Sequence, residues 1–192
     1  TGFSMVWPAN DRPVAVAARS ESNADIWMLP LDPVTHAAIG PPVRRISSSA
    51  RDEHPRFSPD GRRVAFVSWR SGGGDLWMAD ADGGRQRQIS RLGASDPGTP
   101  RWSPDGSQLA FASFTPNAEP HVYLVDADEG LPALGTTGIV SSWSQDGQWL
   151  YGTQLGGAPS IYRLRLADGH RESLIPAGVA AQAATDGTRI FY

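Results

Sequence analysis

Few side chains in this protein have the types and spacing that chemistry requires. Acyl transfer uses an exposed Ser on a sharp turn within Gly-x-Ser-x-Gly, and the sequence contains no such pentapeptide. The four histidines are far apart and lack the His-Glu-x-x-His spacing of a zinc site, while the absence of Cys excludes thiol nucleophiles and disulfides. We therefore expect no catalytic residue, no metal centre and no cofactor in this segment.

Two acidic clusters, at residues 80–83 and 126–130, alternate carboxylates in a way that a hard cation such as Ca²⁺ could use. Both lack the later Glu of an EF-hand loop, and Asp and Gly at these places also suit a tight turn. The turn is the favoured interpretation and a calcium site is the alternative. The run Gly72–Gly74 is not a phosphate loop, because no Lys-Ser or Lys-Thr follows it, and we expect it to connect strands.

One short phrase recurs along the chain and indicates how its elements are arranged. It occupies residues 57–61 (FSPDG), 102–106 (WSPDG) and 143–147 (WSQDG), with degenerate copies at 7–11 and 183–187. The intervals between its Asp positions are 50, 45, 41 and 40 residues, the length of a four-stranded propeller blade. In each copy Pro presets φ, Asp bonds nearby backbone and Gly accepts a positive φ, which predicts a turn between strands. The residues expected to shape these turns are Pro59, Asp60, Gly61, Pro104, Asp105, Gly106, Asp146, Gly147, Asp186 and Gly187.

The second repeat illustrates the expected blade. Residues 54–58 and 64–69 read as the first two strands, 75–80 as the third, and 86–90 as a polar fourth strand at an exposed edge. In four repeats an aromatic residue of the third strand follows the aromatic residue of the first by 20, 20, 21 and 19 residues. Each sheet thus carries large rings at fixed places, where they can pack against the next blade.

The repeats predict an all-β fold, a β-propeller of four-stranded antiparallel blades, with about four and a half blades in an incomplete ring. The chain is then a single partial propeller over 1–192, with repeats at approximately 1–47, 48–90, 91–135, 136–176 and a truncated 177–192. An open arc leaves apolar faces and strand edges bare at both ends. Since the chain also starts inside a repeat, we expect a piece of a longer polypeptide, unstable as an isolated monomer, that is completed by further sequence or by self-association.

Composition narrows the classes of partner. Hydrophobic residues make up 40% and charged residues 19%, as in ordinary globular proteins, and the net charge is −3. The 17 basic residues are all Arg and are scattered, which argues against a nucleic-acid-binding surface. No apolar run approaches the roughly 18 residues of a membrane span, so we expect no membrane insertion in this segment.

The phrase WSPDG, followed by β-rich residues 109–111 or 64–66 and then by DLWMAD at residues 75–80 and Gly83–Gly84, resembles the TolB-like class of WD-type propeller repeats. The resemblance covers essentially the whole chain, with departures at Gln145, at Thr185 and at Asn10. It implies relatives such as periplasmic TolB, the sensor portions of CadC-like winged-helix regulators, and propellers attached to prolyl-oligopeptidase-type hydrolases or to amidohydrolases. Because these relatives differ in activity, the fold does not imply a function.

In a propeller the first strand of each blade lines a central channel, so polar residues just before each repeated aromatic residue should gather near the channel mouth. Arg and carboxylate groups there could hold a peptide carboxylate, a sugar or a cation, and a water-filled polar channel is the alternative. The candidate ligand-binding residues are Glu53, His54, Arg56, Asp96, Thr99, Arg101, Ser141 and Ser142.

These observations predict a non-catalytic module that binds a protein or peptide partner. The resemblance specifies it as the periplasmic or extracytoplasmic sensor or interaction part of a larger protein, such as a CadC-like transcriptional regulator. The alternative is a substrate-gating propeller of a cytoplasmic prolyl-oligopeptidase-type peptidase, or of an amidohydrolase, whose catalytic domain lies outside this segment. A purely structural scaffold is a third hypothesis.

Overall fold

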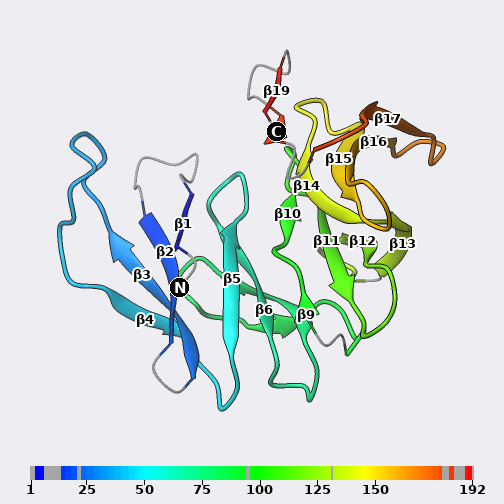
Figure 1. The fold of residues 1–192 in the computed structure, drawn as a ribbon. Coiled ribbons are helices and arrows are strands. Elements are labelled where there is room, and N and C mark those ends of the chain that lie inside the picture. The colour runs from blue at the N-terminus through cyan, green and yellow to red at the C-terminus, as the bar shows by residue number, and fades with distance from the viewer. Residues whose placement is uncertain are drawn as a thin grey trace. The chain divides into compact units, whose positions relative to one another are not determined.

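The protein is built from antiparallel strands. A computed structural model describes residues 3–6, 14–20, 23–93, 96–130, 132–178, 182–183 and 189–191, and none of these is helical. The chain divides into two compact units, Thr1–Pro100 and Arg101–Tyr192. Each unit holds two four-stranded sheets in which consecutive strands are hydrogen-bonded neighbours, which is the arrangement of propeller blades (Figure 1).

The first unit contains two such sheets, drawn from blue to green in Figure 1. The first sheet has the order β1 (Phe3–Val6), β2 (Val14–Ser20), β3 (Ala24–Pro30) and β4 (Val43–Ile46). The second sheet has the order β5 (Asp52–Phe57), β6 (Arg63–Ser68), β7 (Asp75–Asp80) and β8 (Arg87–Gln88). The short strand β9 (Asp96–Pro97) follows near the end of this unit.

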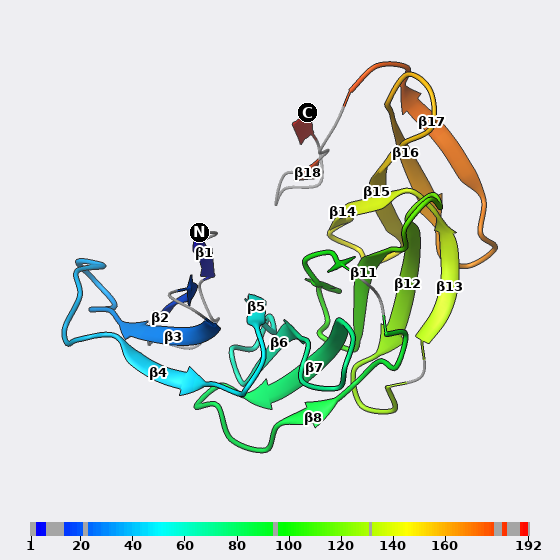
Figure 2. The same ribbon diagram turned by 60° about the horizontal axis from the view of Figure 1, so that its bottom comes forward.

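The second unit repeats the pattern, and its strands can be followed in Figure 2. One sheet runs in the order β10 (Arg101–Trp102), β11 (Gln108–Phe114), β12 (His121–Asp126) and β13 (Pro132–Thr137). The next has the order β14 (Ile139–Trp143), β15 (Trp149–Gln154), β16 (Ser160–Arg165) and β17 (Arg171–Ile175). A two-stranded sheet joins β18 (Gln182–Ala183) to β19 (Ile190–Phe191).

The second blade shows how closely local sequence predicted the strands. β7 has the expected bounds, and β5 and β6 differ from expectation by one or two residues at their ends. β8 is shorter than expected and covers only Arg87–Gln88. The backbone contact with β7 nevertheless continues past β8, because Ile89 is 3% exposed and its amide donates to the Leu76 carbonyl at 2.8 Å.

The apolar core of the first unit lies between its two sheets. Ile26 and Ile46 from the first sheet are each 1% exposed and pack with Phe57 and Phe66 from the second, and Trp77 packs against this cluster. The second unit has an equivalent cluster around Trp143 and Tyr162. Its buried members are Ala110, Val122, Val140, Trp143, Leu150, Tyr162 and Leu164. Rings from first and third strands therefore stabilise the contact between neighbouring sheets in both units.

Three of the repeated turns share one hydrogen-bond pattern. In the first, Ser58 Oγ donates to Asp60 Oδ1 at 2.5 Å and accepts from the Arg63 amide at 3.0 Å. Gly61 closes the turn with φ of 68° and donates its amide to the Ser58 carbonyl. The Ser-to-Asp bond recurs at 2.6 Å between residues 103 and 105 and at 2.5 Å between 144 and 146. Asp186 and Gly187 lie outside the described residues.

These Ser-to-Asp hydrogen bonds make part of the folding stability depend on pH in the acid range. The Ser hydroxyls hold the pKa values of Asp60, Asp105 and Asp146 below the usual value of 3.8. A lowered folded-state pKa contributes stability that is present above the unfolded pKa and is lost as pH falls through the folded pKa. We therefore expect the thermal midpoint of the protein to fall as pH drops below about 4.

A triple Ser→Ala variant at positions 58, 103 and 144 tests this dependence. Its thermal midpoint should be lower than that of the wild type near neutral pH, and it should fall less steeply in acid, because the three pKa values return toward 3.8. The control is Ser49→Ala, at an exposed position away from the turns. Equal acid slopes in the triple variant and the wild type would show that these bonds do not set the dependence.

Candidate functional site

The first strand of the second blade places three of the predicted residues around a β-bulge. The pairing of β5 with β6 shifts between Glu53 and Arg56, so His54 and Pro55 lie in the irregular stretch. His54 has φ of 56°, in the left-handed region that non-Gly residues seldom adopt. Glu53, His54 and Arg56 are all half-buried. A bulge of this kind redirects side chains out of the regular alternation of a strand, and such bulges are common next to binding sites.

An Arg, a Trp and an acid lie beside this bulge. The Arg51 guanidinium lies 4.1 Å from the ring centroid of the half-buried Trp69, and its Nη1 is 4.0 Å from Glu53 Oε2. The Trp69 amide donates to the Arg51 carbonyl at 3.1 Å. The guanidinium lies over the face of the ring, so the charged groups could bind a polar ligand atom while the rest of the ring contacts an apolar group.

The second unit brings together two of its three predicted residues. Arg101 Nε donates to the Ser141 carbonyl at 2.8 Å, and the indole Nε1 of Trp143 donates to the Arg101 carbonyl at 2.9 Å. Ser141 lies where the pairing of β14 with β15 shifts, between Val140 and Ser142. Burial lowers the pKa of the Arg101 guanidinium. A bulged first strand with polar groups therefore occurs in both units.

The positions of the other three predicted residues indicate less about a binding site. Asp96 lies exposed in β9, Thr99 is half-buried just after it, and Ser142 is half-buried in β14. The eight residues form two groups, one within each unit.

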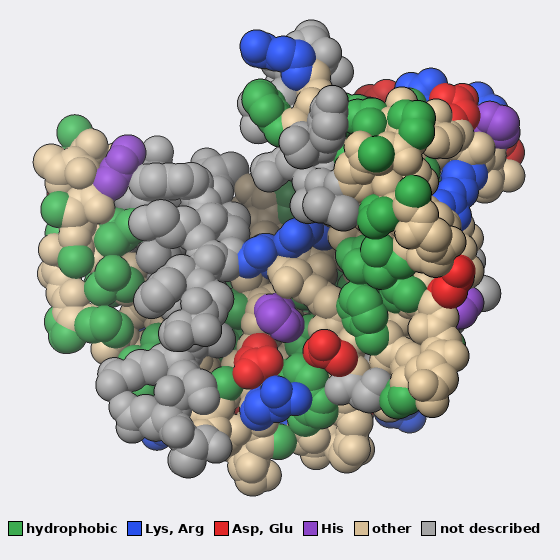
Figure 3. All heavy atoms as spheres, viewed as in Figure 1, with side chains coloured by type: hydrophobic (Ala, Val, Ile, Leu, Met, Phe, Trp, Pro, Cys, Tyr) green, Lys and Arg blue, Asp and Glu red, His purple; other side chains and the backbone are tan. Residues whose placement is uncertain are grey.

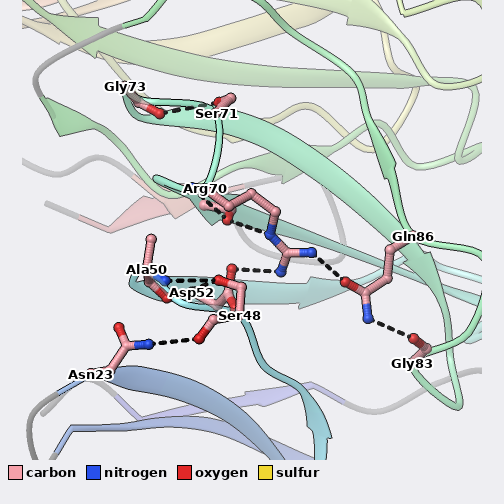
Figure 4. Close-up of polar contacts among 10 residues, drawn as sticks. Asn23, Ser48, Ala50, Asp52, Arg70, Ser71, Gly73, Gly83 and Gln86 are labelled. Atoms are coloured by element: carbon pink, nitrogen blue, oxygen red, sulfur yellow. Dashed lines mark hydrogen bonds and ion pairs between the residues drawn. The ribbon is translucent and has the colours of Figure 1, made fainter.

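Sequence reasoning missed a buried polar cluster around Arg70, which Figure 4 shows. The Arg70 guanidinium donates to Asp52 Oδ1 at 2.8 Å, to Ser68 Oγ at 2.8 Å and to Gln86 Oε1 at 2.6 Å. It also lies 4.7 Å from the Trp77 ring centroid. Asp52 has no exposed surface, so the ion pair is buried at the start of β5, next to the bulge. No local sequence pattern indicated the cluster, because Asp52 and Arg70 meet through the pairing that sets Asp52 opposite Ser68.

Sequence reasoning also missed the role of Asp75, which is 3% exposed at the start of β7. Its carboxylate accepts five hydrogen bonds from uncharged groups. One donor precedes β7, one lies in β8 and three follow β8. The donors are Ser71 Oγ at 2.8 Å, Gln88 Nε2 at 3.1 Å, Ser90 Oγ at 3.2 Å, the Leu92 amide at 2.8 Å and the Gly93 amide at 3.2 Å. Asp75 therefore ties the segment that leaves the second blade to the start of β7.

The described part of the chain gives little support for a metal site, a membrane span or a nucleic-acid-binding surface. Within it, no group of three His, Asp or Glu side chains could hold a metal ion, and no helix is long and apolar enough to cross a membrane. The acidic cluster at residues 80–83 forms a turn in which the Gly83 amide donates to the Asp80 carbonyl at 2.9 Å. On the face drawn in Figure 3, arginine and acidic side chains are interspersed. Such a mixture lacks the basic field of a nucleic-acid-binding surface.

Comparison with known proteins agrees with this architecture. The family profile described as "TolB beta propeller domain" matches residues 48–192. A putative tricorn protease homologue of Streptomyces coelicolor is 35% identical over 72 residues, which are 38% of this chain and 6% of that protein. The Tol-Pal system protein TolB of Bordetella pertussis is 42% identical over 52 residues, 27% of this chain and 12% of that protein.

A solved structure extends the similarity to nearly the whole chain. TolB from Acinetobacter baumannii superimposes with a TM-score of 0.71 over 92% of this chain and 45% of that one, at 23% identity. The chain thus matches less than half the length of each of these proteins. With the blade sheets, the repeated turns and the profile match over residues 48–192, the chain belongs to the TolB β-propeller domain family.

Proposed function

We propose that this propeller segment is a non-catalytic module that binds a protein or peptide partner through the first strands of its blades. In a propeller these strands face the central channel, so bulged first strands would present polar groups to a ligand. The observation that carries the proposal is the left-handed backbone of His54, with φ of 56°. A non-Gly residue held in this region stores strain, and such strain concentrates at functional sites.

The groups around His54 suit a peptide. Arg51 and Glu53 supply charges of both signs, and the Trp69 ring beneath Arg51 supplies an apolar surface for stacking. Peptides carry amides, apolar side chains and charges within a short length, and aromatic and Arg residues dominate the energetics of such interfaces. A peptide or a protein loop is therefore the favoured ligand.

The same proposal places the module in a larger protein outside the cytoplasmic membrane, as its sensor or interaction part. The similarity to the Tol-Pal system protein TolB supports this placement. The finer assignment to a CadC-like transcriptional regulator rests on the sequence resemblance alone, because none of the relatives named above is a winged-helix regulator.

A second candidate function has its own support. The match to the tricorn protease homologue favours a propeller that gates substrate access to a peptidase domain elsewhere in the protein. In that case the bound peptide would be a substrate, the protein would cleave it, and a cytoplasmic location would follow.

Two histidines allow a matched test of the first candidate. His36, in the exposed connection between β3 and β4, has φ of 59°, so both His54→Gly and His36→Gly relieve left-handed strain. We expect each variant to keep or raise the thermal stability of the protein, by up to about 1 kcal/mol. Only His54→Gly should weaken the binding of peptides selected from a phage-displayed random library, by about tenfold or more.

The outcomes separate the hypotheses. Arg56→Ala should also weaken binding without lowering the thermal midpoint. Equal binding by wild type, His54→Gly and Arg56→Ala would reject the channel-strand site, and failure of the wild type to enrich any peptide would favour a structural scaffold. Hydrolysis of the selected peptides by the whole protein would favour the peptidase candidate.

A further inference from the structure

The geometry points to Arg101 as a carboxylate-binding residue, whose two terminal nitrogens donate hydrogen bonds to a carboxylate of a bound peptide. This inference rests on the proposed function and assigns a ligand chemistry to the first strand of the third blade. It concerns residues of the second unit only.

Arg101 is held in place from two sides. Its Nε donates to the Ser141 carbonyl at 2.8 Å, which uses the inner edge of the guanidinium. Its own carbonyl accepts from the indole of Trp143, which is 8% exposed and belongs to the apolar cluster of this unit. The side chain and the backbone are therefore anchored to β14 before any ligand binds, which reduces the entropy lost on binding.

Within the described part of the chain, the outer edge of the same guanidinium has no protein partner. Among the described residues no carboxylate pairs with Arg101, and neither terminal nitrogen makes a hydrogen bond. Arg101 itself is half-buried. Other arginines of this unit, such as Arg163 and Arg165, pair with Glu172 and Asp168.

A half-buried cation without a counter-ion attracts an anion strongly. Burial lowers the pKa of Arg101, and no nearby acid raises it again. The free edge offers two parallel N–H donors, the geometry that matches the two oxygens of a carboxylate. A peptide can supply that carboxylate from its C-terminus or from an Asp or Glu side chain.

A direct test uses a probe that does not depend on peptide selection. In protein labelled with ¹⁵N at arginine, the Nε–H signal that disappears in Arg101→Gln identifies Arg101. Titration with N-acetylglycine should shift this signal to saturation, and the amide of the same compound should leave it in place. An unchanged signal with the acid would overturn the inference, whether or not the protein binds peptides.

Library-selected peptides provide the second test. Arg101→Gln, which keeps a donor for the Ser141 carbonyl, should weaken binding by about 10- to 100-fold, and Arg101→Lys by less, because it retains the charge but loses the paired donors. The matched control is Arg62→Gln, which removes an exposed charge elsewhere. Amidated C-termini and Asp→Asn or Glu→Gln peptides distinguish the two sources of the carboxylate. Peptides that bind Arg101→Gln as tightly as wild type would reject the inference and leave the proposed function standing.

Discussion

Replacing Asp75 by Ala should destabilise the protein by about 3 kcal/mol or more. The buried carboxylate accepts five hydrogen bonds, and its removal leaves the Leu92 and Gly93 amides without their acceptor. A buried donor that loses its acceptor costs more than the bond itself contributed. The expected result is a lower midpoint in chemical denaturation and faster hydrogen exchange at these two amides.

Asp25 provides a matched control at the same repeat position, 50 residues earlier. Among the residues whose side chains are described, its Oδ2 pairs with Arg44, whose side chain is 56% exposed, and its buried Oδ1 has no hydrogen-bond partner. We therefore expect Asp25→Ala to change stability by less than about 1 kcal/mol. Similar losses in the two variants would show that the hydrogen bonds to Asp75 do not explain its contribution.

Replacing Gly152 by Ala should be the second strongly destabilising change, by about 2 to 3 kcal/mol. A Cβ at this position would lie 2.5 Å from the Ile139 carbonyl oxygen and 2.5 Å from the ring and hydroxyl of Tyr162. The carbonyl belongs to the neighbouring strand β14, and Tyr162 is 2% exposed beneath the Arg171 guanidinium, 3.9 Å from its ring centroid. Neither group can move without loss of pairing or packing.

The ionisation of Tyr162 gives a second measurement for this variant. Burial raises its pKa to about 12 in the wild type. If the new methyl group displaces the ring toward solvent, the phenol should titrate closer to its usual value of 10.0. The control is Gly40→Ala, where a Cβ would meet only Pro30 Cγ at 3.5 Å and stability should change by less than about 0.5 kcal/mol. A variant as stable as Gly40→Ala would contradict the steric argument.

The candidate site was only partly accessible to sequence reasoning. The positions just before each repeated aromatic residue identified Arg101 and Ser141, which the structure joins by a hydrogen bond. The same reasoning could not find the ion pair between Asp52 and Arg70, because β5, a turn and β6 lie between them and the two meet only through strand pairing. It also could not foresee the bulge at His54, since His carries no strong preference for a left-handed backbone.

The fourth blade shows a further limit of repeat alignment. Gly152 occupies the register position of Phe66 and Phe111, opposite the aromatic residue of the third strand. Aligned repeats would suggest that a large side chain fits there. Packing excludes a large side chain at Gly152, because in this blade the Tyr162 ring fills the space that the Phe side chain fills in the others.

The sequence by itself determined the repeat, the all-β blades, the turns between their strands and the family, because turn geometry and strand alternation depend on residues close together in the chain. Only the tertiary structure decided which of two equivalent aspartates is held by five donors, and that Arg101 pairs with no acid among the described residues. Those properties depend on donors and charges from distant segments and on how far burial removes them from water, which no local pattern specifies.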